Sequence, residues 1–226
     1  MTGRAVDVGP MRGSVATDGA RPAATRRDLV AAVGLLALLV LAVTARWAAI
    51  QGAVADPIAI GVGFGLALMA VAAIGRSSPL RRMPRADQPT LGDLGWSAVI
   101  GLAGGGALVA VALAGRAVAG APVALPPLRG DLFAPWAFAT ILVASGEEAV
   151  LRGVLFGRLL RGAGIWPAIL VTSLVFALMH VPFYGWRVVP LDLGVGIWFA
   201  GLRLWSGGIV APSISHALAD LATWWL

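Results

Sequence analysis

The chain has only two glutamates and two histidines, and all four lie in apolar segments. Glu147 and Glu148 are adjacent, His180 ends an apolar run, and His216 lies in the last apolar stretch. Ionisable groups at the centre of a membrane helix cost roughly 2.5–3.5 kcal/mol each on insertion scales, so they usually have a function. The sequence therefore predicts one polar site inside a membrane.

The glutamates begin the first of three motifs, Glu147-Glu148-x-x-x-Arg152. In a helix, Glu148 and Arg152 are four residues apart and share a face, so they are expected to form an ion pair. Glu147 lies about 100° round the helix from Glu148. This spacing leaves the carboxylate of Glu147 free for proton transfer.

The other two motifs place each histidine one helical turn from a partner. Phe176 precedes His180 by four residues, and His216 precedes Asp220 by four. Phe176 is expected to pack beside the imidazole of His180 and to fix its plane. Asp220 would hold the tautomer of His216, or would itself be a ligand or hydrogen-bond partner.

Together these groups have the chemistry for peptide hydrolysis. Glu147 would take a proton from a water that His180 positions, and His216 and Asp220 would bind the oxyanion or the substrate carbonyl. An alternative is Zn²⁺ held by Glu147, His180 and His216. The spacing His-Glu-x-x-His is absent, so such a metal site would need ligands from separate helices. A structural role also remains open, since Glu–Arg pairs and single histidines often only join helices.

The composition predicts an all-α, polytopic transmembrane helix bundle. Hydrophobic residues make up 59% of the chain and charged residues 12%, against about 25% charged residues in a soluble domain. The absence of cysteine excludes disulfides and thiol nucleophiles. The net charge of +6 comes from arginines between apolar runs, so we expect no nucleic-acid partner. About seven spans (six to eight) are expected against the ~20 apolar residues that a bilayer requires, at 29–50, 57–74, 94–119, 132–151, 166–180, 189–204 and 208–226.

The arginines predict the orientation and the organisation of the chain. They concentrate in the N-terminal tail and in the second, fourth and sixth loops, which places the N-terminus in the cytoplasm and the C-terminus outside. On this interpretation Arg158 and Arg161 serve topology. We expect a disordered tail at 1–28, N-terminal transmembrane helices at 29–131 and a catalytic core at 132–226. Gly101 and Gly105 predict close helix packing in the third span.

The three motifs, in this order on separate apolar segments, resemble those of the CPBP family, which comprises CAAX prenyl proteases and bacteriocin-processing (Abi) proteins. The resemblance covers roughly 133–226. It implies that Glu147 and His180 activate water and that His216 and Asp220 lie at the oxyanion, and it agrees that Glu148 pairs with Arg152. One departure is Asp220, where an Asn would be a ready oxyanion donor: either Asp220 is protonated or it orients His216.

The expected function is therefore an intramembrane endopeptidase in a bacterial cell membrane. Its substrate would be a hydrophobic or lipidated (CAAX-like) membrane peptide, and we favour metal-independent glutamate catalysis over a Zn²⁺ enzyme. The alternatives are a proton-coupled membrane transporter, in which the Glu and His groups form a relay, and a non-catalytic immunity or scaffold protein.

Overall fold

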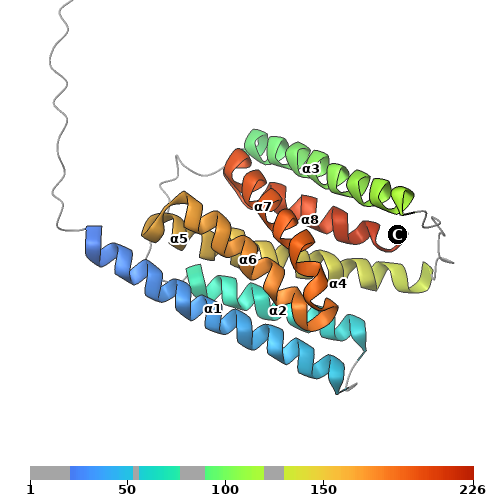
Figure 1. Cartoon of the computed structure of the whole chain (residues 1–226), viewed down its shortest axis with the longest axis horizontal. Helices are drawn as coiled ribbons and strands as arrows, with labels where there is room; N and C mark the ends of the chain where they lie inside the picture. The colour runs from blue at the N-terminus through green and yellow to red at the C-terminus, as the bar shows by residue number, and fades with distance from the viewer. Residues whose placement is uncertain (1–20, 53–55, 77–89, 120–129) are drawn as a thin grey trace, which may run out of the picture.

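The computed structural model describes residues 21–52, 56–76, 90–119 and 130–226, and the regular structure of these residues is entirely helical. Figure 1 shows the helices packed into one bundle. The helices are α1 (Arg21–Gln51), α2 (Pro57–Arg76), α3 (Leu91–Val118), α4 (Gly130–Glu148), a π-helix (Ala149–Leu155), α5 (Phe156–Ala163), α6 (Ile165–Tyr184), a 3₁₀ turn (Trp186–Val188), α7 (Val189–Ser206) and α8 (Val210–Ala222). The predicted all-α class is confirmed.

Each of the seven predicted spans coincides with a helix. Five helical segments are long and apolar enough to cross a membrane, namely α1, α2, α3, α6 and the segment Trp186–Ser206 that contains α7. The crossings by α4 and α8 stay predictions, and α8 has only 13 residues. The fifth segment is longer than predicted, because α6 continues through Pro182 to Tyr184. His180 therefore lies inside a helix and not at its end.

Helix α1 begins earlier than the sequence predicted, and ion pairs near its start anchor it to α5. The predicted tail runs to residue 28, whereas α1 starts at Arg21; residues 1–20 lie outside the described part. Asp28 in α1 is buried and accepts hydrogen bonds from Arg158 at 3.2 Å and from Arg161 at 3.0 and 3.1 Å. Arg158 also donates to the carbonyl of Gly75 at 2.8 Å. These two arginines, assigned to topology from the sequence, thus also hold α1 and α2 against α5.

Glycines allow α3 to approach α8 closely, as predicted. A Cβ on Gly101 would lie 2.7 Å from the carbonyl oxygen of Ala211, and one on Gly105 would lie 2.9 Å from Leu218. Figure 1 shows the two helices running side by side. Because α8 carries His216 and Asp220, this contact positions one wall of the candidate site.

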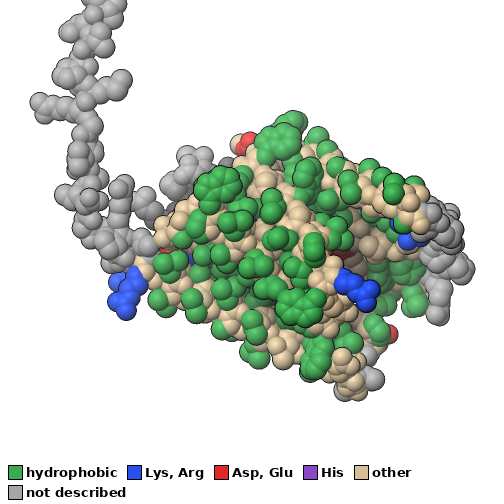
Figure 2. Space-filling model, viewed as in Figure 1, with side chains coloured by type: hydrophobic (Ala, Val, Ile, Leu, Met, Phe, Trp, Pro, Cys, Tyr) green, Lys and Arg blue, Asp and Glu red, His purple; other side chains and the backbone are tan. Residues whose placement is uncertain are grey.

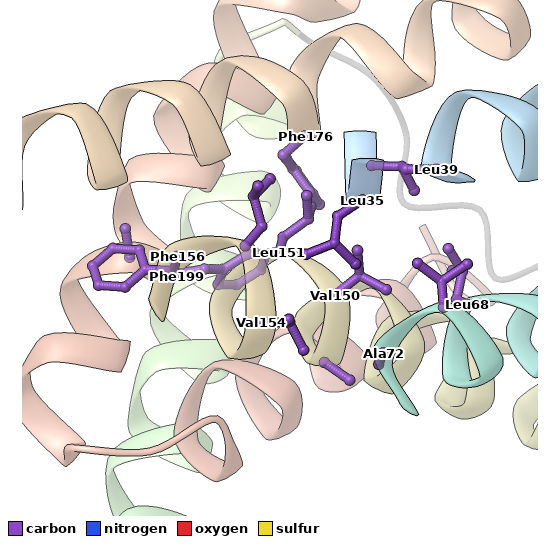
Figure 3. Close-up of a cluster of buried hydrophobic side chains, with 14 of the residues drawn as sticks. Leu35, Leu39, Leu68, Ala72, Val150, Leu151, Val154, Phe156, Phe176 and Phe199 are labelled. Atoms are coloured by element: carbon purple, nitrogen blue, oxygen red, sulfur yellow. The ribbon is translucent and has the colours of Figure 1, made fainter. Parts of the chain in front are cut away.

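The π-helix lies in the middle of the bundle and directly follows the two glutamates. Its apolar side chains are buried, among them Val150, Leu151 and Leu155. Figure 3 shows Val150 and Leu151 in a cluster with Leu35 and Leu39 of α1, Leu68 and Ala72 of α2, and Phe176 and Phe199. Short π-segments inside α-helices occur frequently at functional sites. Here the segment fixes Arg152 beside the glutamates while its apolar side chains hold it in the core.

The outer surface is apolar. Large hydrophobic side chains are exposed along α1, α3 and α6, including Leu41, Val111 and Leu170. Figure 2 shows such side chains spread over one face of the molecule, with few charges between them. This surface suits contact with lipid chains.

The α3–α8 contact yields a stability prediction with a matched control. We expect Gly101→Ala to lower the thermal unfolding midpoint in detergent by roughly 2–10 °C, because the added methyl group overpacks the contact by about 1–3 kcal/mol. Gly106→Ala is the control, since a Cβ there meets nothing within 4 Å. Alanine is also the better helix former, so the control should unfold at the same temperature or slightly higher. Equal midpoints in the two variants would contradict the packing.

Candidate active site

A fully buried ion pair forms the base of the site. Arg152 Nη1 donates to Glu148 Oε1 at 3.0 Å, and neither side chain is exposed. Arg152 Nη2 donates to the carbonyl oxygen of Gly196 in α7 at 2.9 Å. The predicted pair is therefore present, and it also joins the π-helix to α7.

Two aromatic rings and a second arginine complete the surroundings of Arg152. Its guanidinium carbon lies 4.9 Å from the ring centroid of Phe176 and 5.4 Å from that of Phe199. Arg203 donates to the backbone carbonyl of Arg152 at 3.1 Å. Cation–π contacts of this kind stabilise a desolvated guanidinium. Glu148 and the two ring faces thus offset the charge of the guanidinium, while Arg152 Nε is buried without a hydrogen-bond partner.

His216 contacts all three carboxylates of the predicted site. Its Nδ1 donates to Glu148 Oε1 at 3.1 Å, and its Nε2 lies 3.4 Å from Asp220 Oδ2 and 3.7 Å from Glu147 Oε2. The imidazole is 3% exposed and stacks on Phe199 with ring centroids 4.8 Å apart. Since Nδ1 faces a carboxylate, the hydrogen bond fixes that nitrogen as a donor. Glu148 therefore orients both Arg152 and His216.

His180 has its own partners on α6 and α7. Its Nδ1 lies 2.8 Å from the carbonyl oxygen of Phe176 and 3.3 Å from Asp192 Oδ2. Both neighbours are acceptors, so Nδ1 carries the hydrogen, and the neutral ring keeps a lone pair on Nε2. The Phe176 ring meets the imidazole edge-on at 4.8 Å, as the spacing predicted. Phe176 also packs edge-on against His216 at 5.4 Å, so one ring separates and positions both histidines.

A cavity of about 810 Å³ opens beside these histidines. Every α-helix except α5 contributes to its wall, which is mostly apolar. The ionisable side chains in the wall are Arg46, His180, Tyr184, Asp192, His216 and Asp220. Such a largely apolar cavity with a few convergent polar groups is typical of a binding site.

The structure brings the predicted residues together but places them at two depths. His180, His216, Asp220 and Phe176 line the cavity. Glu147 does not line it: its side chain is 2% exposed and lies behind His216. Both imidazoles nevertheless interact electrostatically with Glu147, so the three groups form one unit. Glu148 and Arg152 are deeper still and orient the others.

Several residues of the site were not predicted from the sequence. Asp192 partners His180, Gly196 supplies a carbonyl to Arg152, and Phe199 stacks on His216. All three lie on α7, which has none of the three motifs. Asp192 is an acidic residue in a predicted span, and the same reasoning that selected the glutamates would have found it. The roles of Gly196 and Phe199 depend on helix packing and have no local pattern.

The Zn²⁺ alternative stays a prediction. Within the described ranges, no three His, Cys, Asp or Glu side chains are grouped so that they could hold a metal ion. We assign no step of the chemistry to a metal.

Comparison with known proteins agrees with the motifs. Residues 129–222 match the family model described as type II CAAX prenyl endopeptidase Rce1-like. The chain is 34% identical over 89 residues to the membrane-embedded CAAX protease MroQ of Staphylococcus aureus (strain USA300). It is 29% identical over 84 residues to the uncharacterized protein YpbD of Bacillus subtilis (strain 168).

These matches are partial. They cover 37% of this chain in both cases, 35% of MroQ and 40% of YpbD. No solved structure matches the chain. The resemblance to the CPBP family is confirmed for the C-terminal part of the chain, and with the five apolar helices it identifies an integral membrane protein.

The shared carboxylate of Glu148 yields a second stability prediction. We expect Glu148→Gln to destabilise the detergent-solubilised protein by about 3–5 kcal/mol, because it leaves the buried Arg152 without its counter-charge. Asp220→Asn is the matched control: it is the same carboxylate-to-amide change beside the same histidine, but the Asp220 side chain is 43% exposed. Chemical unfolding of both variants measures the difference. Equal free energies of unfolding for Glu148→Gln and Asp220→Asn would contradict the dependence of Arg152 on this pair.

Proposed function

We propose that this protein is an intramembrane endopeptidase that hydrolyses a peptide bond in a hydrophobic or lipidated membrane peptide. The observation that carries the proposal is the convergence of Glu147, His180 and His216 from three helices beside one largely apolar cavity. The match of residues 129–222 to the CAAX prenyl endopeptidase model supports the same reaction.

Glu147 and His180 have the chemistry to activate a water. The lone pair on His180 Nε2 accepts a hydrogen bond from the water and aims it, while the Glu147 carboxylate takes one proton. The hydroxide then forms a bond to the carbonyl carbon of the substrate, whose oxygen becomes an oxyanion. Transfer of the proton from Glu147 to the leaving nitrogen breaks the carbon–nitrogen bond and releases an amine and a carboxylic acid.

His216 is placed to stabilise the oxyanion. His216 lines the cavity and its Nδ1 is fixed by Glu148 at 3.1 Å, so that with a proton on Nε2 this second nitrogen can donate to an oxyanion. Such a pre-positioned donor is worth about 3–4 kcal/mol to the transition state. Asp220 Oδ2, 3.4 Å from Nε2, is an acceptor that can hold the hydrogen of this nitrogen in place. We therefore propose that Asp220 acts through His216 and does not donate to the oxyanion itself.

The apolar wall supports a hydrophobic substrate. Its residues come mainly from aliphatic and aromatic side chains, such as Leu108, Val143, Leu191 and Phe199. A peptide with apolar residues or a lipid chain would bury those groups against this wall and would gain roughly 25 cal/mol per Å² of apolar surface. The relative MroQ is named a CAAX protease, and we propose a lipidated or similarly apolar peptide for this chain too.

The charges at the two ends of the bundle support an orientation. The end that holds the start of α1 carries seven arginines of the described ranges, Arg21, Arg26, Arg27, Arg76, Arg158, Arg161 and Arg203. The opposite end, to the right in Figure 1, carries three, Arg46, Arg116 and Arg187. By the positive-inside rule we propose that the N-terminus is cytoplasmic. The cavity residues Arg46, Tyr184 and Thr223 would then lie towards the non-cytoplasmic face.

Loss of either water-activating group should abolish cleavage. We expect Glu147→Gln and His180→Ala each to lower the rate of peptide cleavage by roughly 10²–10⁴-fold, because a positioned base contributes that much. The purified protein would be assayed on a panel of hydrophobic and lipidated peptides. On the proposed mechanism a chelator leaves the rate unchanged.

Arg187→Gln is a control for this assay, since Arg187 is exposed and lies outside the cavity wall. Cleavage at the full rate by both Glu147→Gln and His180→Ala would end the assignment. A proton-driven flux in proteoliposomes that requires Glu147, without any cleavage, would instead favour a transporter.

The orientation is testable because the chain has no cysteine. Leu91 and Val118, at the two ends of α3, are 88% and 90% exposed. We expect a membrane-impermeant maleimide to label Val118→Cys on intact cells, and to label Leu91→Cys only after the membrane is opened. The opposite pattern would place the cavity towards the cytoplasm.

A further inference from the structure

We propose that Arg46 binds a carboxylate of the peptide substrate and so makes this protein selective for peptides with an acidic group near the cleaved bond. This inference rests on the proposed function, since it describes how the same cavity selects its substrate. Arg46 lies on α1, outside the residues 129–222 that match the family model.

Arg46 is held in the cavity wall by two aromatic rings. Its guanidinium carbon lies 4.6 Å from the ring centroid of Phe64 on α2 and 4.7 Å from that of Phe183 on α6. Its Nε is buried and has no hydrogen-bond partner. Rings on two helices restrict the guanidinium to one region, which lowers the entropy that it loses when it binds a ligand.

Arg46 lacks a close ionisable partner of the kind that the two carboxylates of the cavity have. Asp192 lies 3.3 Å from His180, and Asp220 lies 3.4 Å from His216. Over the described part of the chain, by contrast, Arg46 forms no ion pair and donates no hydrogen bond, although it interacts electrostatically with Glu147. An arginine in an apolar wall without such bonds is costly unless a ligand supplies them.

The position of Arg46 places such a ligand close to the reacting groups. Phe183, which contacts the guanidinium, is three residues beyond His180 on α6. Three residues of an α-helix correspond to roughly 4.5 Å along its axis, and one extended peptide residue spans up to about 3.6 Å. A peptide whose scissile bond lies at His180 therefore reaches Arg46 within a few residues.

A carboxylate is the group that fits. The planar guanidinium pairs bidentately with carboxylates, and an acidic group of a peptide would supply both the missing charge and the missing acceptors. In a peptide this group is either the C-terminal carboxylate or the side chain of Asp or Glu. The two sources share their chemistry, so they are separated by the choice of peptides.

The test measures binding, so that it does not depend on cleavage. The full-length protein with Glu147→Gln, reconstituted in nanodiscs, would be titrated with three fluorescent peptides of one hydrophobic sequence. One peptide has a free C-terminal carboxylate, one has a C-terminal amide, and one has the amide together with a Glu near the C-terminus. The same titrations are made with Arg46→Gln, Arg46→Lys and Arg187→Gln added, and thermal midpoints check folding.

We expect the Glu147→Gln protein that retains Arg46 to bind at least one acidic peptide with an affinity at least about tenfold higher than its affinity for the neutral amide. This is the gain expected from a hydrogen-bonded ion pair. The peptide that shows the gain identifies the source of the carboxylate. Arg46→Gln should remove the preference, Arg46→Lys should retain part of it, and Arg187→Gln should leave it unchanged.

Three results would overturn the proposal. They are equal binding of the three peptides, a preference that survives Arg46→Gln, and no binding of any peptide. If Arg46 only supports the packing of the cavity wall, its loss changes the affinity for all three peptides equally. Failure of cleavage by the unmodified protein, together with an Arg46-dependent preference, would reject the hydrolase and keep the carboxylate site.

Discussion

The site depends on one buried carboxylate that accepts hydrogen bonds from two side chains. Glu148 Oε1 accepts from both Arg152 and His216, inside a bundle whose other contents are mostly apolar. In such a weakly polar interior a buried charge must be paired. The pair must also keep its geometry, because separating its members leaves an uncompensated buried charge. Glu148 therefore fixes where α8 and the π-helix stand relative to each other. Arg152 extends the constraint to α7 through the carbonyl of Gly196.

The N-terminal helices complete a site whose motifs lie elsewhere. The matched residues 129–222 contain Glu147, Phe176, His180 and His216, yet the cavity beside them also has walls from α1, α2 and α3. The glycines of α3 bring that helix against α8, and Asp28 of α1 holds α5 through Arg158. We infer that the matched core supplies the reacting groups and that the preceding helices shape what reaches them.

Contacts within one helix could be predicted from the sequence, and contacts between helices mostly could not. The spacing of Glu148 and Arg152, and that of Phe176 and His180, predicts pairs that the structure contains, because residues four apart meet through local geometry alone. The partnership of His180 with Asp192, and the place of Arg46 between two rings, depend on how distant segments pack. Gly101 is an intermediate case, since small residues indicate a close approach without naming the partner helix.

The π-helix between α4 and α5 sets the rotational phase of the chain on either side of it. The preceding helix α4 aligns Glu147 and Glu148 with His216, and the following helix α5 aligns Arg158 with Asp28. A π-segment bonds residues five apart and so holds more residues per turn than the α-helices on either side of it. A change in the number of residues between Ala149 and Leu155 must therefore be absorbed by a different hydrogen-bond pattern within this segment. Otherwise either the acidic pair or the anchor of the first helix loses its alignment.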